Sequence, residues 1–143
     1  MTAAAEATIR AFREADRPGL VRLWAEAFPD DPPRSAPERM IDAALRVHPE
    51  LLFVAELDGA VVGAVIAGFD GMRGWIYHLA VVAAHRRRGI ATRLMRAAGE
   101  ALRTAGCPKV NLQVRAENRG VVAFYRAIGF EVEERISMGR RLE

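Results

Sequence analysis

Apolar and polar positions along the chain follow two alternating periods, and these periods predict its elements. Apolar residues recur at helical spacing in residues 17–28, 35–48, 90–105 and 119–128. Short apolar or alternating runs predict strands at residues 8–12, 51–57, 60–67, 75–82 and 109–114, and residues 130–142 favour one or two closing strands. The resulting order, β-α-α-β-β-β-α-β-α-β, predicts an α/β fold with a mixed sheet and helices on both faces.

Turn and capping residues set the expected limits of these elements. Asp16 is typical of a helix N-cap, and Ser35 with Glu38 fits a capping box at the start of the second helix. Asp58-Gly59 is a strong two-residue hairpin signal, and residues 68–74 form a second, glycine-rich hairpin loop.

The stretch Trp75–Leu102 joins a buried-type strand, a basic turn and an amphipathic helix. The turn is His85-Arg86-Arg87-Arg88-Gly89. The first turn of a helix has backbone N–H groups without partners and the positive end of the helix dipole, and a glycine lets an anion approach the backbone closely. The stretch therefore predicts an anion site, and the alternative is an ordinary turn with solvated arginines.

Composition narrows the class of protein. A chain of 143 residues with 51% hydrophobic residues suits one globular domain, residues 1–143. Cys107 is the only cysteine, which excludes an internal disulfide and a multi-cysteine metal site. No apolar run has membrane-helix length and no secretory signal is visible, so we expect a cytoplasmic protein.

Charge does not indicate a nucleic-acid partner. The pI is 9.7, but the net charge is only +3, and the one dense basic cluster is residues 86–88. No aromatic platform or second basic patch accompanies it. Neither a P-loop nor a dinucleotide-binding glycine motif occurs, so other phosphate-binding classes are disfavoured.

Two motifs together resemble a known superfamily. The first is Arg86-x-x-Gly89-x-Ala91, and the second is Asn118-x-x-Val121-x-x-Phe124-Tyr125-x-x-x-Gly129-Phe130. They are similar to the Gln/Arg-x-x-Gly-x-Gly/Ala and Asn-x-x-Ala-x-x-Phe/Leu-Tyr-x-x-x-Gly-Phe motifs of GNAT acyltransferases, with Val121 where alanine is common. The chain resembles in particular the small bacterial GNAT proteins of the YpeA type. The resemblance implies a GNAT fold with a mostly antiparallel sheet of six to seven strands.

The resemblance also implies acetyl-CoA as co-substrate and no metal. Backbone N–H groups from Arg87 through Thr92 would bind the CoA pyrophosphate, and Leu79-Ala80-Val81 would pair with the pantetheine arm like a further strand. The implied cofactor-binding residues are Leu79, Ala80, Val81, Arg86, Arg87, Arg88, Gly89, Ile90, Ala91, Thr92 and Asn118.

The implied reaction is direct attack of an amine on the thioester. The Val81 N–H would polarise the thioester carbonyl, and the Tyr125 hydroxyl would protonate the leaving thiolate. An acceptor ammonium must first lose a proton. The glutamates that serve this step in two better-known branches are replaced here by Gln113 and Trp75, so a water-relayed base is expected.

Four residues are candidates for the acceptor side. Tyr77 and His78 lie on the strand before the basic turn, and Asp30 and Asp31 lie in the loop after the first helix. The carboxylates could bind a cationic amine or belong to a solvated turn. The acceptor would be a small-molecule amine or an amine of a peptide or protein.

A second reading is a GNAT-fold module that binds acyl-CoA without turnover, which the missing glutamates motivate. Neither a nucleic acid nor a membrane is expected as a partner. Whether the closing strands pair between two copies in a homodimer is left open.

Overall fold

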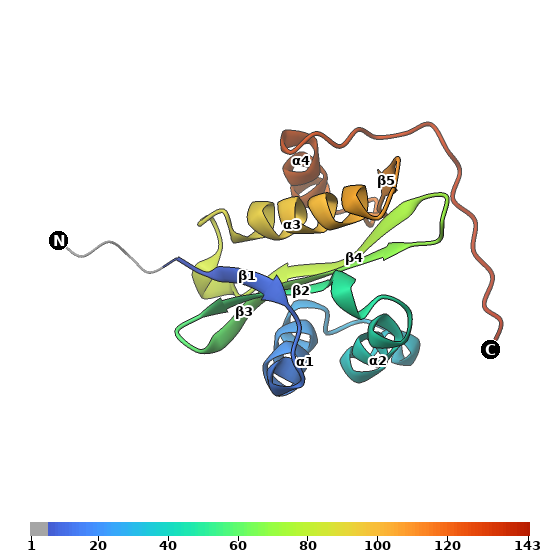
Figure 1. Ribbon diagram of the computed structural model, residues 1–143. Coiled ribbons are helices and arrows are strands. Elements are labelled where there is room, and N and C mark those ends of the chain that lie inside the picture. The colour runs from blue at the N-terminus through green and yellow to red at the C-terminus, as the bar shows by residue number, and fades with distance from the viewer. Residues whose placement is uncertain (1–5) are drawn as a thin grey trace. The chain divides into compact units, whose positions relative to one another are not determined.

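The computed structural model describes residues 6–143, which form two compact units, one reaching to Leu112 and one spanning Gln113–Glu143. The expectation about a secretory signal concerns a stretch that includes residues 1–5, which lie outside the described residues. The strands and helices of the first unit are β1 (Thr8–Ala11), α1 (Arg17–Ala27), α2 (Pro37–Val47), β2 (Leu52–Leu57), β3 (Ala60–Phe69), β4 (Gly74–Val81), α3 (Ile90–Thr104) and β5 (Val110–Asn111) (Figure 1).

The strands of the first unit form one five-stranded sheet in the order β1-β2-β3-β4-β5. The first four strands pair antiparallel, and β5 pairs parallel to β4. Antiparallel neighbours need only short connections, whereas the parallel pair needs a crossover, which α3 supplies. The predicted mixed, mostly antiparallel α/β fold is therefore confirmed, with fewer strands than the six or seven expected.

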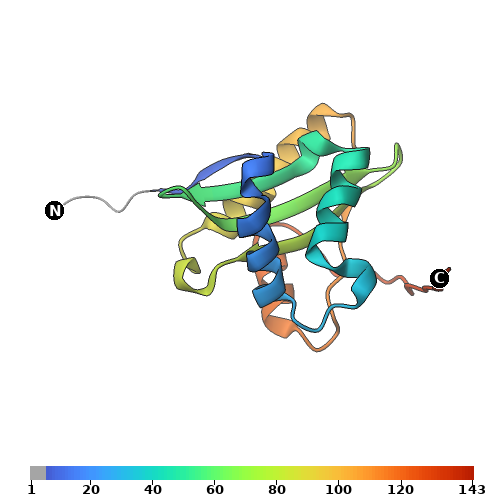
Figure 2. The same ribbon diagram turned by 90° about the horizontal axis from the view of Figure 1, so that it is seen from below.

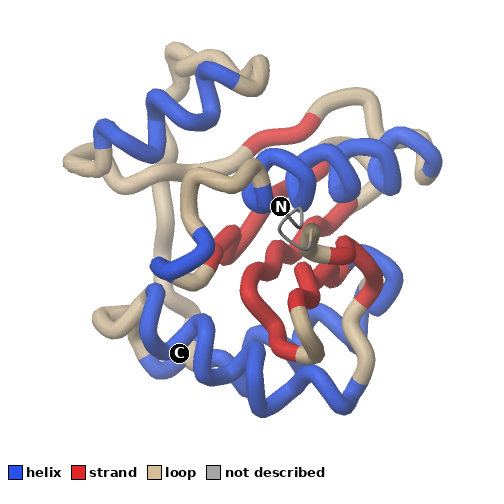
Figure 3. Tube along the Cα trace, turned by 90° about the vertical axis from the view of Figure 1, so that its left-hand side faces the viewer, coloured by secondary structure: helices blue, strands red, loops and turns tan. Residues whose placement is uncertain are grey.

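Helices cover both faces of this sheet, as predicted. α1 and α2 lie on one face and α3 lies on the other (Figures 1 and 3), and Figure 2 shows α1 and α2 side by side across the strands. The core between α1, α2 and the sheet includes the fully buried side chains of Leu20, Trp24, Ile41, Leu52 and Val54. α3 buries Ile90, Leu94, Ala98 and Leu102, which recur every four residues along one face.

Asp16 precedes α1 as predicted, but its carboxylate does not cap the helix. It accepts hydrogen bonds from the two terminal nitrogens of Arg10 at 2.8 and 2.9 Å, and from the Arg13 N–H at 2.8 Å. The Arg10 guanidinium lowers the pKa of Asp16 below its usual range. A bidentate bond to a guanidinium is stronger than a bond to a helix N–H, which explains why the capping prediction was wrong.

The capping box predicted at Ser35 and Glu38 does not form. α2 begins at Pro37 after the N-cap Ala36, and Ser35 ends a short 3-10 turn. Proline at the first helical position has its φ already set, and it holds the preceding Ala36 extended, with ψ of 141°. Glu38 instead forms an ion pair with Arg17, with 2.8 Å between the charged atoms.

In the second unit, α4 (Arg119–Ala127) matches the predicted last helix to within one residue. The Asn118 side chain accepts a hydrogen bond from the Val121 N–H at 3.4 Å, so Asn118 is the N-cap, as predicted.

The closing strands predicted in residues 130–142 do not form, and β5 covers only Val110–Asn111 of the strand predicted at 109–114. Residues 131–143 are exposed, and the segment contributes apolar side chains only at Val132, Ile136, Met138 and Leu142. Glu134 and Arg140 interrupt the alternation, so no continuous apolar face exists for a sheet to bury. No helix among residues 6–143 is both long enough and apolar enough to cross a bilayer.

Candidate functional site

A β-bulge interrupts β4 beside its pairing with β3. Val65 of β3 stands opposite both His78 and Leu79 of β4. His78 has a φ of +55°, in the left-handed region that a residue with a Cβ rarely adopts. Bulges and strained backbone are both concentrated at functional sites, so this point of β4 is a candidate site.

The other edge of β4 is open beyond its first two residues. β5 pairs with β4 only at Gly74 and Trp75. Among the described residues of the first unit, no strand therefore lies on that edge beside residues 76–81 of β4. An unpaired strand edge offers N–H and C=O groups that an extended ligand can bind.

The bulge decides which N–H groups face this open edge. The Gly74 N–H donates to Lys109 O, on the β5 side, and the Val82 N–H donates to Val62 O, on the β3 side, both at 2.8 Å. In an uninterrupted strand these two N–H groups would point the same way, and the bulge shifts the alternation by one residue. The N–H of Val81, next to Val82, therefore points towards the open edge.

The basic turn leads into α3 with a backbone shape suited to an anion. Arg87 and Gly89 both have left-handed φ values, +64° and +76°. The first helical hydrogen bond runs from the Arg93 N–H to Gly89 O at 3.0 Å, so the N–H groups of residues 90–92 come before it. A Cβ at Gly89 would meet no atom of the described residues beyond its chain neighbours within 4 Å, so there is open space beside the backbone at this position.

Arginine side chains surround the turn. Arg86 Nε donates to Val81 O at 3.3 Å and ties the turn to the end of β4. Arg88 Nη1 lies 3.3 Å from His85 Nδ1, and the side chains of Arg87 and Arg88 are exposed. The fold thus brings the cofactor residues that were predicted in the first unit to one place, at the end of β4 and the start of α3.

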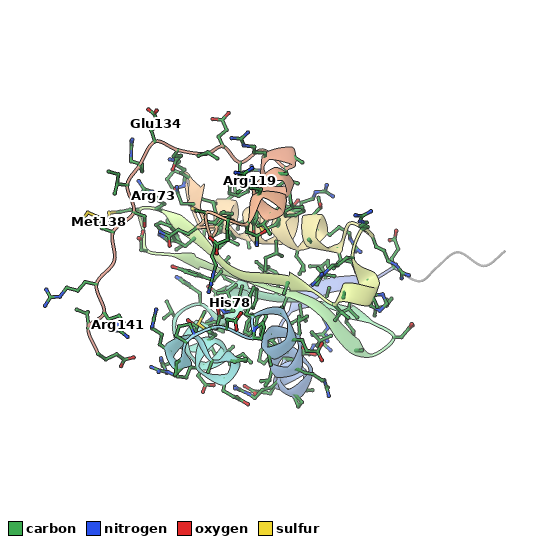
Figure 4. The ribbon with its side chains drawn as sticks, turned by 180° about the vertical axis from the view of Figure 1, so that it is seen from behind. Arg73, His78, Arg119, Glu134, Met138 and Arg141 are labelled. Carbon is green, nitrogen blue, oxygen red and sulfur yellow. The ribbon has the colours of Figure 1, made fainter. Side chains whose placement is uncertain are left out.

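His78 and Asp31, two of the predicted acceptor residues, are in direct contact. His78 Nε2 lies 2.9 Å from Asp31 Oδ2, and the side chains are 16% and 19% exposed. The His78 ring packs edge-on against Trp24 and Phe28 of the first helical segment, on the face of the sheet covered by α1 and α2 (Figure 4). The Trp24 indole N–H also donates to His78 O at 2.9 Å. Asp30, in contrast, is exposed.

A pocket of about 230 Å³ lies on the same face of the sheet, between α2 and the strands β3 and β4. Its lining consists of Met40, Ala43, Ala44, Val47, His48, Ile66, Ala67, Gly68 and Tyr77. Tyr77 is half-exposed there, and burial together with the Asp70 carboxylate raises the pKa of its phenol. Consecutive side chains of a regular strand point to opposite faces of the sheet. Because of the bulge, Tyr77 at the pocket and His78 beside Asp31 lie on the same face.

The remaining predicted residues belong to the second unit. Tyr125 is buried there, and its ring packs against Phe124 and Phe130 with centroid distances of 5.2 and 5.5 Å. Burial raises the pKa of the Tyr125 phenol to about 12. Gln113, at one of the positions where other branches have glutamate, donates a hydrogen bond to the Ser137 hydroxyl.

Sequence reasoning missed the contribution of α1 to this site. Trp24 and Phe28 lie within the helix predicted at residues 17–28, where the pattern marks them only as apolar positions, yet both contact His78. The available signal was their type, since an indole N–H in a core needs an acceptor. Among the described residues, no group of three or more His, Cys, Asp or Glu is arranged to hold a metal ion.

Comparison with known proteins identifies the family of the chain. The sequence model of the acetyltransferase (GNAT) family matches residues 17–130. The chain is 39% identical over 134 residues to an acetyltransferase of Yersinia enterocolitica, covering 94% of both chains. The chain therefore belongs to the GNAT acetyltransferase family.

Solved structures share the fold. The crystal structure of Ard1 from Thermoplasma volcanium has a TM-score of 0.80 at 26% identity, covering 90% of this chain and 85% of that one. The aminoglycoside N-acetyltransferase AAC(6′)-Iy in complex with CoA has a TM-score of 0.80 at 20% identity, covering 99% of each chain.

Proposed function

We propose that this protein transfers the acetyl group of acetyl-CoA to a primary amine by direct attack. Membership of the GNAT acetyltransferase family supports the class of reaction. One structural observation supports it most strongly: the open edge of β4 lies next to an arginine-flanked, left-handed turn at the start of α3. Acetyl-CoA has an extended arm that ends in phosphates. The open strand edge can bind the arm, and the turn can bind the phosphates.

On this proposal, the turn residues hold the cofactor by its pyrophosphate. The N–H groups of residues 87–92 would bind phosphate oxygens, and Arg86, Arg87 and Arg88 would add positive charge. The segment Leu79–Val81 would bind the pantetheine arm through its open edge, with Asn118 as a further hydrogen-bonding group. The CoA bound to AAC(6′)-Iy supports the choice of cofactor.

The Val81 N–H and the Tyr125 hydroxyl would act on the thioester. An N–H that points towards the open edge is suited to stabilise the negative charge that develops on the thioester oxygen. The raised pKa of Tyr125, about 12, keeps its phenol protonated at neutral pH, as a proton donor to the leaving thiolate must be.

The acceptor would approach from the face of the sheet that α1 and α2 cover. Tyr77 lines the apolar pocket on that face, and the pair of His78 and Asp31 lies on the same face. An exposed Asp30 could assist by attracting a cationic amine. A pocket lined mainly by aliphatic side chains, with His48 and Tyr77 as its polar side chains, suits an amine carried on an apolar group.

The alternative function is a module that binds acyl-CoA without turnover. Gln113 and Trp75 at positions of known catalytic glutamates favour it. A panel of kanamycin, spermidine, tyramine and a peptide with a free α-amino group distinguishes the two, with thiol release from acetyl-CoA as the measurement. Binding of acetyl-CoA without thiol release across this panel would support the module and contradict the enzyme.

Tyr125→Phe tests the chemistry of the proposed enzyme. The substitution keeps the ring and its contacts with Phe124 and Phe130 and removes only the hydroxyl. We expect kcat to fall by ~10²-fold, the lower end of what positioned acid catalysis contributes. The affinity for acetyl-CoA, measured by calorimetry, should change by less than about tenfold, since one hydrogen bond contributes about 1 kcal/mol net.

Phe124→Leu is the matched control, because it alters the same aromatic cluster without touching the hydroxyl. A Tyr125→Phe enzyme with the turnover of the wild type would remove the acid role from Tyr125. Because the phenol pKa is about 12, the wild-type rate should also show no alkaline decline from Tyr125 up to about pH 10.

A further inference from the structure

We infer that His78, held by Asp31, accepts the proton that the acceptor ammonium must lose before it attacks. This inference rests on the proposed acetyl transfer and deepens it by naming a base in place of a water relay. Its starting point is the contact of 2.9 Å between His78 Nε2 and Asp31 Oδ2. The two residues are 47 positions apart in the chain, so the fold itself creates the pair.

The contact selects the form of the imidazole. A carboxylate accepts hydrogen bonds, so the neutral ring carries its proton on Nε2 and leaves the lone pair on Nδ1. Nδ1 can then take a proton, and Asp31 stabilises the imidazolium that results. This is the role that a carboxylate has beside a catalytic histidine in acyl-transfer enzymes.

The surroundings of His78 fix its ring in one place. Trp24 and Phe28 pack edge-on at centroid distances of 5.4 and 4.7 Å, and the Trp24 N–H holds the His78 carbonyl oxygen. From β3, the residue opposite is the apolar Val65. Asp31 is the titratable group in contact with His78, and Tyr77 is its titratable neighbour along β4.

The backbone of His78 argues for a role beyond packing. Its φ of +55° costs free energy for any residue with a Cβ, about 1 kcal/mol or more, and glycine or asparagine would adopt it more easily. A histidine in this conformation, in contact with a carboxylate and at the bulge that precedes Leu79–Val81, stands next to the segment that would hold the thioester.

Each proton in the proposed reaction has a donor and an acceptor. The ammonium gives one proton to His78 Nδ1, and the free amine forms a C–N bond to the thioester carbon. The C–S bond breaks, and the sulfur takes a proton from the Tyr125 hydroxyl. The amide nitrogen gives up its second proton, which restores Tyr125 through solvent, and the imidazolium returns its proton to water. One proton remains on the amide nitrogen.

His78→Gly is the sharpest test, because glycine readily adopts the left-handed φ and keeps the carbonyl that binds Trp24. With the panel amine that the wild type acetylates fastest, we expect kcat to fall by ~10²-fold or more. Imidazole added to the assay should restore turnover by about tenfold or more, because it supplies the missing base. The affinity for acetyl-CoA should stay within about threefold of the wild type.

Asp31→Asn tests the partner as a positioning residue. It should lower kcat while leaving the affinity for acetyl-CoA unchanged, and imidazole should not restore it, since the ring is still present. Asp58→Gly is the matched control: Asp58 also has a left-handed φ, +50°, but lies exposed in the β2–β3 turn. It should retain wild-type turnover and show no response to imidazole.

Turnover of His78→Gly within about threefold of the wild type, or a loss that imidazole does not change, would overturn the assignment. Failure of the proposed function has a different signature. In that case the wild-type protein itself releases no thiol with any panel amine, while its acetyl-CoA binding remains.

Discussion

Asp16 is a carboxylate at the edge of the core whose charge is compensated by named partners. Its side chain is 8% exposed, and it is bonded to Arg10 and to the Arg13 N–H. Removing one partner from a buried ion pair leaves the other charge without compensation, which destabilises more than the intact pair stabilises. Asp16 therefore links β1 to the start of α1.

Asp16→Asn should lower the free energy of unfolding at pH 7 by about 2 to 3 kcal/mol, because Arg10 loses its bidentate partner and keeps only the 3.4 Å contact with Glu56. The pKa of Asp16 is lowered in the folded state by Arg10. Its stabilisation is therefore complete above the unfolded value of about 4 and is lost as the pH falls below it. Urea unfolding between pH 7 and pH 3 should show the gap between wild type and variant closing as the pH falls.

Glu14→Gln is the control, because Glu14 is an exposed carboxylate that also pairs with an arginine, Arg17. Exposed pairs contribute little, so this variant should unfold like the wild type at pH 7. A gap between wild type and Asp16→Asn that is the same at pH 3 as at pH 7 would contradict the charge argument.

The hydrogen-bonding partners of single polar residues could not be predicted from the sequence. Asp31 and His78 were each predicted as acceptor residues, but nothing local indicated that they would touch, since the contact depends on how β4 and α1 pack. Asp16 was predicted as a helix N-cap, but its carboxylate binds the guanidinium of Arg10, six residues before it, instead of the helix N–H groups.

At the scale of elements, the junction of β4 with β5 depends on a close approach at Gly74. A Cβ on Gly74 would lie 2.8 Å from Cys107 Sγ, closer than real contacts allow. Gly74 also begins the short parallel pairing, with its N–H bonded to Lys109 O at 2.8 Å. The absence of a side chain at position 74 therefore lets the chain after α3 return against β4.

Gly74→Ala should lower the free energy of unfolding by about 1 to 3 kcal/mol, the usual effect of overpacking a close contact. Cys107→Ala removes the sulfur that the new methyl group would meet. In the double variant, the cost of Gly74→Ala should therefore be smaller, measured as a coupling energy from urea unfolding of all four proteins. Additive effects would show that Cys107 is not the obstacle.

Elements whose signals are local were predicted well. The Asp58-Gly59 turn, the apolar face of α3 and the Asn118 cap all depend on neighbours within a few residues, and each is present in the structure. The closing strands depended on a partner strand and on a continuous apolar face, and residues 130–142 provide apolar residues at only some positions of that face. The open edge of β4 was expected only through the family resemblance.

At the scale of the whole molecule, a ligand that binds only the folded state must raise its stability. The proposed cofactor would bind groups that exist only after folding, namely the open edge of β4 and the turn before α3. Acetyl-CoA at about one hundred times its Kd should therefore add about 2.7 kcal/mol, which corresponds to roughly 8 °C in Tm for a chain of this size.

Gly89 provides a matched pair of variants for this effect. Asp and Asn have the same shape and both tolerate the left-handed φ of +76° at this position, where a Cβ has open space. Gly89→Asp places a negative charge where phosphate would bind, whereas Gly89→Asn does not.

In the absence of ligand, thermal unfolding of the two variants should be similar. With acetyl-CoA, Gly89→Asp should show little rise in Tm, and its affinity by calorimetry should fall more than tenfold, over about 1.4 kcal/mol. Gly89→Asn should keep most of the rise, because its side chain is neutral and the N–H groups of residues 90–92 are unchanged. An equal rise in both variants would remove the phosphate site from this turn, and an equal loss would assign the effect to the added volume instead of the charge.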